Sequence, residues 1–119
     1  MNKAIIIDDD ASNLEVLTMI VQSKGWDVLS CLDGKDLITT ALIYRPRLII
    51  LDIILADGDG MKLCTKLREE PLLKTIPIYL ISTNKPSEGN ISSAKASGFI
   101  EKPFEIEVIL NILDQFEDA

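Results

Sequence analysis

The sequence contains no histidine. Without an imidazole, the chain cannot supply a Ser–His–Asp or Cys–His catalytic group, a histidine ligand for zinc, or a phosphohistidine carrier. It has two cysteines, Cys31 and Cys64, both in apolar surroundings, and we expect reduced thiols rather than a disulfide. The chemistry open to this chain therefore uses carboxylates, hydroxyls and lysine.

Long apolar runs and basic clusters are also missing. No stretch approaches the roughly 20 apolar residues of a membrane span. The first residues, Met-Asn-Lys followed by four apolar residues and then acids, do not form a signal peptide. Lys and Arg number 12 against 19 Asp and Glu, and no basic run is longer than a pair. These features predict a cytoplasmic protein with no membrane span and no direct nucleic-acid binding through a basic face.

The composition that remains is that of a folded domain. Of 119 residues, 47% are hydrophobic and 26% are charged. These fractions are ordinary for a globular protein, so the excess of acidic residues does not indicate a disordered chain. A chain of this length buries roughly two-thirds of its unfolded surface. With no linker, low-complexity stretch or internal repeat, the sequence predicts one domain over residues 1–119.

Short apolar runs alternate with amphipathic segments along the chain. The runs cover residues 4–7, 28–31, 48–51, 78–81 and 99–100. They do not alternate polar with apolar residues, so we expect both faces of each strand to be buried, as in a parallel sheet.

Five helical segments follow these five strands in strict alternation. In the first, Ser12 and Glu15 are expected to form a capping box, and Gly25 ends the helix. The second ends before Pro46, the third ends before Pro71, and the others cover residues 87–96 and 105–116. This order predicts an α/β, doubly wound domain with right-handed crossovers.

Polar residues follow four of the predicted strands. They are Asp8, Asp9 and Asp10 after the first, Asp52 after the third, Ser82 and Thr83 after the fourth, and Lys102 and Pro103 after the fifth. Each alone has a plainer interpretation: a helix cap for Asp10 or Ser12, a turn for Ser82, a surface charge for Lys102. Function in such folds lies beyond the carboxyl ends of the strands. Convergent carboxylates there suit Mg²⁺, and with a hydroxyl and a lysine they supply what phosphoryl transfer to a carboxylate needs.

The sequence resembles the receiver domain of two-component response regulators over essentially its whole length. The matching stretches are residues 5–10, 48–53, 59–60, 77–82 and 102–104, in order and at the expected strand ends. The resemblance implies a flavodoxin-like (βα)5 sandwich with strand order 2-1-3-4-5.

The resemblance also implies roles for the acidic residues. Asp52 corresponds to the phosphoacceptor. Asp8 and Asp9 correspond to the acidic pair that holds Mg²⁺, or Mn²⁺ in its place, Asp9 directly and Asp8 through water. Asp52 and the backbone carbonyl of Ile54 complete the implied metal ligands.

Three further positions carry implied roles. Ser82 corresponds to the hydroxyl that binds the phosphoryl group, and Lys102 to the lysine that pairs with it. Phe99 corresponds to the aromatic switch residue that moves with Ser82, and the bond from Lys102 to Pro103 is expected to be cis.

The chain departs from the family pattern at several positions. Ala56 replaces a frequent proline, and Thr83 stands where a small residue is common. Phe99 has no hydroxyl, so a switch there would act through packing alone. The 17 positions from Ser82 to Phe99 (99 − 82) are about two fewer than is usual, so inference about the partner is weakest there.

The resemblance implies a phosphoacceptor that takes its phosphoryl group from a histidine kinase or a histidine phosphotransfer protein. It would signal to an unknown downstream protein by changed binding, as a monomer or weak dimer, and it would not be an enzyme beyond assisting its own phosphotransfer and slow dephosphorylation. One alternative is a receiver fold that docks proteins without phosphorylation. A remote alternative is a haloacid-dehalogenase-like phosphatase, because Asp8, Asp10 and Ser12 mimic that family's first motif. Only residues 104–119 follow Lys102 and its proline, and they form one predicted helix with no further acidic motif.

Overall fold

The computed structural model describes residues 1–55 and 58–117. Its central sheet contains five parallel strands in the order β2-β1-β3-β6-β7. The strands are β1 (Lys3–Ile7), β2 (Asp27–Cys31), β3 (Leu48–Asp52), β6 (Ile78–Ser82) and β7 (Gly98–Glu101). Counted by these main strands the order is 2-1-3-4-5, which confirms the predicted fold. Ala56, one of the departures named above, lies outside the described residues.

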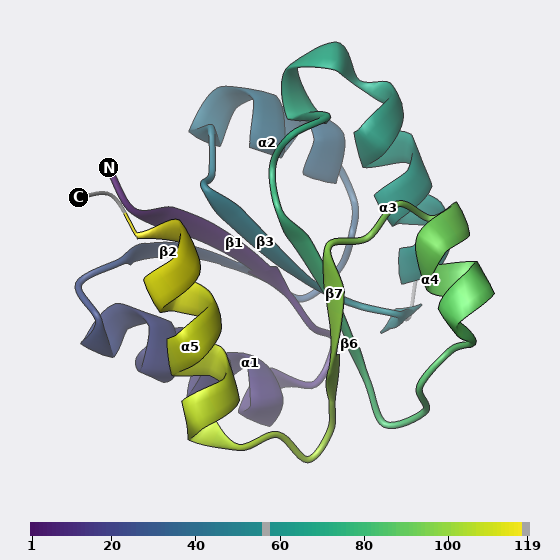
Figure 1. Cartoon of the computed structure of the whole chain (residues 1–119). Helices are drawn as coiled ribbons and strands as arrows, with labels where there is room; N and C mark the ends of the chain where they lie inside the picture. Colours follow the sequence, from purple (N-terminus) through teal and green to yellow (C-terminus); the bar gives the residue numbers. More distant parts are fainter. Residues whose placement is uncertain (56–57, 118–119) are drawn as a thin grey trace.

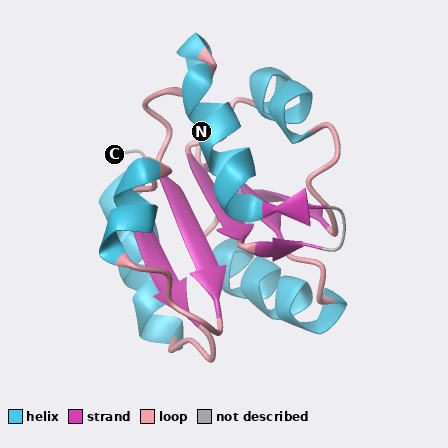
Figure 2. Ribbon diagram, turned by 90° about the vertical axis from the view of Figure 1, so that its right-hand side faces the viewer, coloured by secondary structure: helices cyan, strands magenta, loops and turns pink. Residues whose placement is uncertain are grey.

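Helices cover both faces of the sheet (Figures 1 and 2). On one face lie α1 (Ala11–Ser23) and α5 (Ile106–Phe116), and on the other α2 (Leu37–Tyr44), α3 (Gly60–Glu69) and α4 (Glu88–Ser93). Successive residues of the central strands supply the two apolar cores alternately. Ile6 and Ile50 pack toward α1 and α5, whereas Ile5 and Ile49 pack toward the other three helices.

The prediction that both faces of every strand are buried is correct for the three central strands and wrong for the two edge strands, β2 and β7. In β7 only Ile100 is buried, and Glu101 is exposed. The side chains of β1, β3 and β6 are almost all buried, but Asp27 and Ser30 of β2 are exposed and its other residues are half-buried. Because β2 is an edge strand, it has a neighbouring strand on one side only and less helix cover.

The start of α1 corrects a second prediction. Asp10 is the N-cap, and its Oδ1 accepts hydrogen bonds from the backbone N–H groups of Ser12 (2.9 Å) and Asn13 (3.2 Å). The capping box of Ser12 and Glu15 is therefore wrong, since the helix begins earlier and Ser12 lies inside it. Aspartate caps as well as serine does, so the two starts could not be separated by residue type. Gly25 follows the helix at φ +82°, as a helix stop requires.

Short elements add to the predicted pattern between β3 and β6. The pair β4 (Ile54–Leu55) and β5 (Gly58–Asp59) forms a two-stranded antiparallel sheet directly after the carboxyl end of β3, and η1 (Pro71–Leu73) is a 3₁₀ turn after α3. The fourth helix is shorter than residues 87–96. None of the helices in the described part of the chain has the length and hydrophobicity that a membrane crossing requires.

Candidate functional site

A buried ion cluster lies where the carboxyl ends of β1, β3 and β7 meet. Lys102 Nζ is 3.0 Å from Asp8 Oδ2 and 3.1 Å from Asp52 Oδ2. Asp8 is fully buried and Asp52 is 4% exposed. The parallel sheet thus brings three charged groups from distant parts of the sequence into direct contact, at the edge that the sequence predicted.

Backbone donors hold the second oxygen of each carboxylate. Asp8 Oδ1 accepts a hydrogen bond from the N–H of Asp10 at 2.9 Å, and Asp52 Oδ1 accepts one from the N–H of Ile54 at 3.1 Å. At the second oxygen the two carboxylates differ: Asp52 Oδ2 accepts a hydrogen bond from Lys102, whereas Asp8 Oδ2 is ion-paired with Lys102 but accepts no hydrogen bond from a described residue. This arrangement leaves little rotational freedom to either side chain before a reaction.

Burial governs the protonation of this cluster. It raises the pKa of the Asp52 carboxyl, and the nearby charge of Asp8 adds to this, against the lowering effect of Lys102 and the Ile54 N–H. Burial alone would lower the pKa of Lys102, but its contacts with Asp8 and Asp52 outweigh that effect and raise it. Lys102 therefore stays protonated at neutral pH and can neutralise a ligand's negative charge.

Asp9 completes a group of three carboxylates. One oxygen each from Asp8, Asp9 and Asp52 can be chosen so that all lie within 4.8 Å of one another, and Asp9 is the exposed member. Three carboxylates and one ammonium sum to a charge of −2. Hard oxygen donors with excess negative charge, open on one side, fit a divalent cation such as Mg²⁺.

Ser82 lies beside this cluster on the neighbouring strand. It is 2% exposed, its Oγ accepts a hydrogen bond from the N–H of Asn84 at 3.3 Å, and its carbonyl accepts one from the N–H of Lys102 at 2.9 Å. The hydroxyl proton has no acceptor among the described residues, so it is free to donate to a ligand. The Lys102–Pro103 peptide bond is cis.

Phe99 lies on the strand that pairs with Ser82's strand, but not directly beside Ser82. In the register of β6 and β7, Phe99 pairs with Leu80 and Ser82 pairs with Glu101. Phe99 is half-buried and borders a hollow of about 360 Å³ that Ile91 of α4 also lines. Ser82 does not line this hollow, so the space beside the ring is separate from the hydroxyl, and coupling between Phe99 and Ser82 stays a prediction.

Gly60 has a structural role that sequence reasoning did not identify. Its N–H donates to the carbonyl of Ile53 at 2.7 Å. A Cβ at this position would overlap the carbonyl oxygen of Asp52 and lie 2.8 Å from the Cα of Ile53. The sequence did offer a signal for this role, which is the short spacing between Asp52 and the pair Asp59-Gly60. A loop this short brings its last residue back against the end of the strand it left, and that residue must then lack a side chain.

The sequence profile of the response regulator receiver domain matches residues 4–114 of this chain. The chain therefore belongs to the response regulator receiver family, a family of signalling domains. The probable transcriptional regulatory protein TcrX of Mycobacterium tuberculosis is 30% identical over 108 residues, which cover 89% of this chain and 45% of that protein. The chain spans about half the length of the curated relatives it matches.

Solved structures agree with this assignment. Chemotaxis protein CheY4 of Vibrio cholerae superposes with a TM-score of 0.89 at 25% identity, covering 98% of each chain. The BeF3-activated N-terminal receiver domain of Klebsiella pneumoniae RstA superposes with a TM-score of 0.85 at 26% identity, covering 97% of each chain. The protein is thus a receiver of the two-component type.

Proposed function

We propose that Asp52 accepts a phosphoryl group from a phosphohistidine and that the resulting acyl phosphate changes which proteins this domain binds. The observation that carries the proposal is the position of Lys102, whose ammonium contacts Asp52 and Asp8 in a nearly closed site. A carboxylate oxygen of Asp52 attacks phosphorus, the phosphorus–nitrogen bond of the donor breaks, and the imidazole leaves as its neutral or protonated form.

The residues around Asp52 have separate tasks in this step. The N–H of Ile54 holds Oδ1, so the carboxylate is oriented before the donor arrives. Lys102 and the Ser82 hydroxyl donate to phosphoryl oxygens as charge moves onto them. Asp8, Asp9 and Asp52, with the carbonyl of Ile54, would hold Mg²⁺ or Mn²⁺, which supplies further charge neutralisation at the phosphoryl oxygens when bound.

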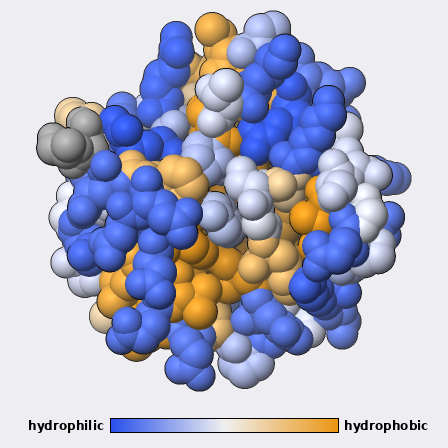
Figure 3. Space-filling view, viewed as in Figure 1, coloured by the Kyte–Doolittle hydropathy of each residue, from blue (hydrophilic) through white to orange (hydrophobic). Residues whose placement is uncertain are grey.

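Asp52 is almost fully buried, so a donor histidine can reach it only from the open side of the site. A histidine kinase or a histidine phosphotransfer protein would therefore have to dock at this edge of the sheet. Apolar surface beside the site offers a place for it. Figure 3 shows such surface over α5 and α1, and both helices expose apolar side chains. The exposed ones are Val16 and Met19 of α1 and Ile106 and Val108 of α5.

The proposal has further parts. The domain acts in the cytoplasm as a monomer or weak dimer, with a downstream protein as its output. It does not bind nucleic acid directly, which the net charge of −7 supports. Its only catalysis concerns its own phosphorylation and dephosphorylation.

The test is phosphorylation by acetyl phosphate in Mg²⁺, read by intact-protein and peptide mass spectrometry. We expect one added phosphoryl group on the peptide that contains Asp52 and none on Asp52→Asn. The control is Asp33→Asn, which removes an exposed acid while keeping an oxygen that can accept the turn hydrogen bond from Lys35. Full phosphorylation of Asp52→Asn would refute the acceptor assignment. Failure of the wild type to accept the group would favour the docking module that acts without phosphorylation.

A further inference from the structure

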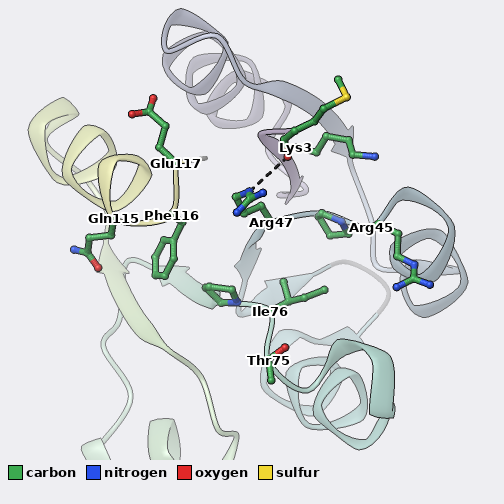
Figure 4. A pocket seen from close by; sticks show the side chains of 11 residues that line it. Lys3, Arg45, Arg47, Thr75, Ile76, Gln115, Phe116 and Glu117 are labelled. Atoms are coloured by element: carbon green, nitrogen blue, oxygen red, sulfur yellow. Dashed lines mark hydrogen bonds between the residues drawn. The ribbon is translucent and has the colours of Figure 1, made fainter. Parts of the chain in front are cut away.

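A second hollow lies at the opposite end of the sheet from the carboxylate cluster. Its volume is about 760 Å³, and it lies between the amino end of β1, the segments before β3 and β6, and the end of α5 (Figure 4). Lys3 begins β1 and lines the hollow, whereas Asp8 follows the carboxyl end of the same strand. The phosphoacceptor proposal makes no use of this hollow.

Positive charge is concentrated here in an acidic protein. Three of the chain's 12 Lys and Arg residues line the hollow, and the acidic residue that lines it among the described residues is the exposed Glu117. Lys3 and Arg45 form no ion pair with any described residue, and Lys3 Nζ lies 5.0 Å from the centre of the Tyr44 ring. The hollow is therefore suited to an anion, although the net charge of −7 disfavours anions elsewhere.

The backbone of Arg45 shows which substitution this position tolerates. Arg45 caps the end of α2 with φ 57° and ψ 61°, in the left-handed region, where glycine fits without steric cost. Lys95, which does not line the hollow, has the same conformation at φ 60°, so the conformation by itself does not mark Arg45 as a functional residue. It does allow the Arg45 side chain to be removed by a change to glycine without backbone strain.

The other side of the hollow is apolar and includes an aromatic ring. Ile76, Pro77 and Phe116 are half-buried, and Figure 4 shows the Phe116 ring beside Arg47, with Lys3 and Arg45 farther off on the other side of the hollow. Guanidinium groups bind phosphate oxygens in pairs, and a phenyl ring offers a surface for a flat heterocycle. The hollow thus offers one polar and one apolar wall to the same ligand.

We propose that this hollow binds a nucleotide, with its phosphates on the side of Lys3 and Arg45 and its base against Phe116. The volume falls in the range of about 300–1,000 Å³ found for small-molecule pockets. An acidic peptide fits less well, because the strands that begin here, β1, β3 and β6, are interior strands with no free edge to pair with. Pro46 and Pro77 also line the hollow and have no N–H to offer a peptide carbonyl.

The experiment is calorimetric titration of the whole chain with ADP, GDP, pyrophosphate and adenosine in EDTA. EDTA removes divalent cations, so the carboxylate cluster cannot bind the nucleotide through a metal ion. We expect one saturable site for at least one of the two nucleotides, and at least tenfold weaker binding of both pyrophosphate and adenosine. The amide resonances of Arg45, Ile76 and Phe116 should shift, while those of Asp52 and Ser82 should not.

Variants separate this site from general charge effects. Arg45→Gly and Lys3→Gln should each weaken nucleotide binding about tenfold, since each removes charged hydrogen bonds to phosphate. Lys66→Gln, which removes an exposed helix charge away from the hollow, should bind as the wild type does. Because φ favours glycine at position 45, Arg45→Gly should melt no lower than the wild type, so its loss of binding cannot come from unfolding.

Three results would overturn the proposal. They are the absence of saturable binding of either nucleotide at 5 mM, equal binding of pyrophosphate and nucleotide, and an equal loss of affinity in Lys66→Gln and Arg45→Gly.

Discussion

Replacing Gly60 by alanine should destabilise this protein more than the size of a methyl group suggests. The added Cβ would overlap the carbonyl oxygen of Asp52 and approach the Cα of Ile53 to 2.8 Å. Both obstacles are backbone atoms. The carbonyl belongs to the last residue of a buried central strand, so neither a rotamer change nor a small shift of the loop relieves the contact.

The expected cost can be worked out from this geometry. Overpacking by one methylene costs about 1–3 kcal/mol, and an obstacle made of backbone places Gly60→Ala near about 3 kcal/mol. A domain of this size loses about 4 °C of melting temperature per kcal/mol, so the variant should melt about 12 °C below the wild type. Since the displaced peptide belongs to Asp52, phosphorylation of the folded fraction should also slow.

Gly58 provides a matched control two residues away. A Cβ there meets nothing within 4 Å, so Gly58→Ala should change the free energy of unfolding by no more than about 0.5 kcal/mol. Urea unfolding can be followed by the fluorescence of Trp26, the single tryptophan, which is 2% exposed in the folded state. Equal stability of Gly60→Ala and Gly58→Ala would show that the loop shifts at little cost to make room for the methyl group. The close approach of position 60 to the backbone of Asp52 and Ile53 would then not explain why glycine is there.

Mg²⁺ at a hundredfold excess over its Kd should raise the free energy of unfolding by about 2.7 kcal/mol, and Asp9→Ala should lose most of this gain in thermal melts; equal gains would contradict the ligand assignment. Asp52→Asn should modestly stabilise the metal-free protein in urea, because burial raises the pKa of that carboxyl and its charged form therefore costs folding free energy. Ser82→Ala should still be phosphorylated, but the phosphoryl analogue beryllofluoride should shift the Phe99 amide less than in the wild type. Ile54→Asn should speed hydrolysis of the acyl phosphate, because the exposed Ile54 side chain offers no polar atom to position water; wild-type decay within seconds would argue that another group does so.

The strand ends were predictable because the physics of a parallel sheet is simple. Apolar runs that do not alternate must be buried on both faces, and their carboxyl ends must then lie at one edge. Asp8, Asp52 and Lys102 followed such runs, so the sequence alone was enough to predict that they come together. What it could not supply is the detail of their contact, in which Lys102 bridges both carboxylates while backbone N–H groups hold the remaining oxygens.

Other features depend on packing that no local pattern encodes. The two-residue strands β4 and β5 are too short to show periodicity, and Gly60 was recognisable only as part of a motif until the Asp52 carbonyl was seen beside it. The basic hollow is assembled from residues near 3, 45, 76 and 116, which are separated along the chain and gathered by the fold. None of them follows a strand, so the rule that identified the carboxylate cluster could not find them.

One hydrogen bond links the phosphorylation site to the segment that leads to α4. Ser82 Oγ accepts from the N–H of Asn84, while its proton is free to donate. A phosphoryl group on Asp52 would attract that proton, and Ser82 would bring Asn84 with it as it moved. Only a short segment separates Asn84 from Ser87, the N-cap of α4, whose Oγ accepts from the N–H of Asn90. Only Ile91 of the six residues of α4 is buried, and the contacts that anchor the helix lie at its other end, where Cys64 Sγ donates to the carbonyl of the C-cap Ala94 at 3.3 Å and Arg68 Nε donates to that of Lys95 at 2.8 Å. A shift of Ser82 would therefore act on the amino end of α4, the less anchored end.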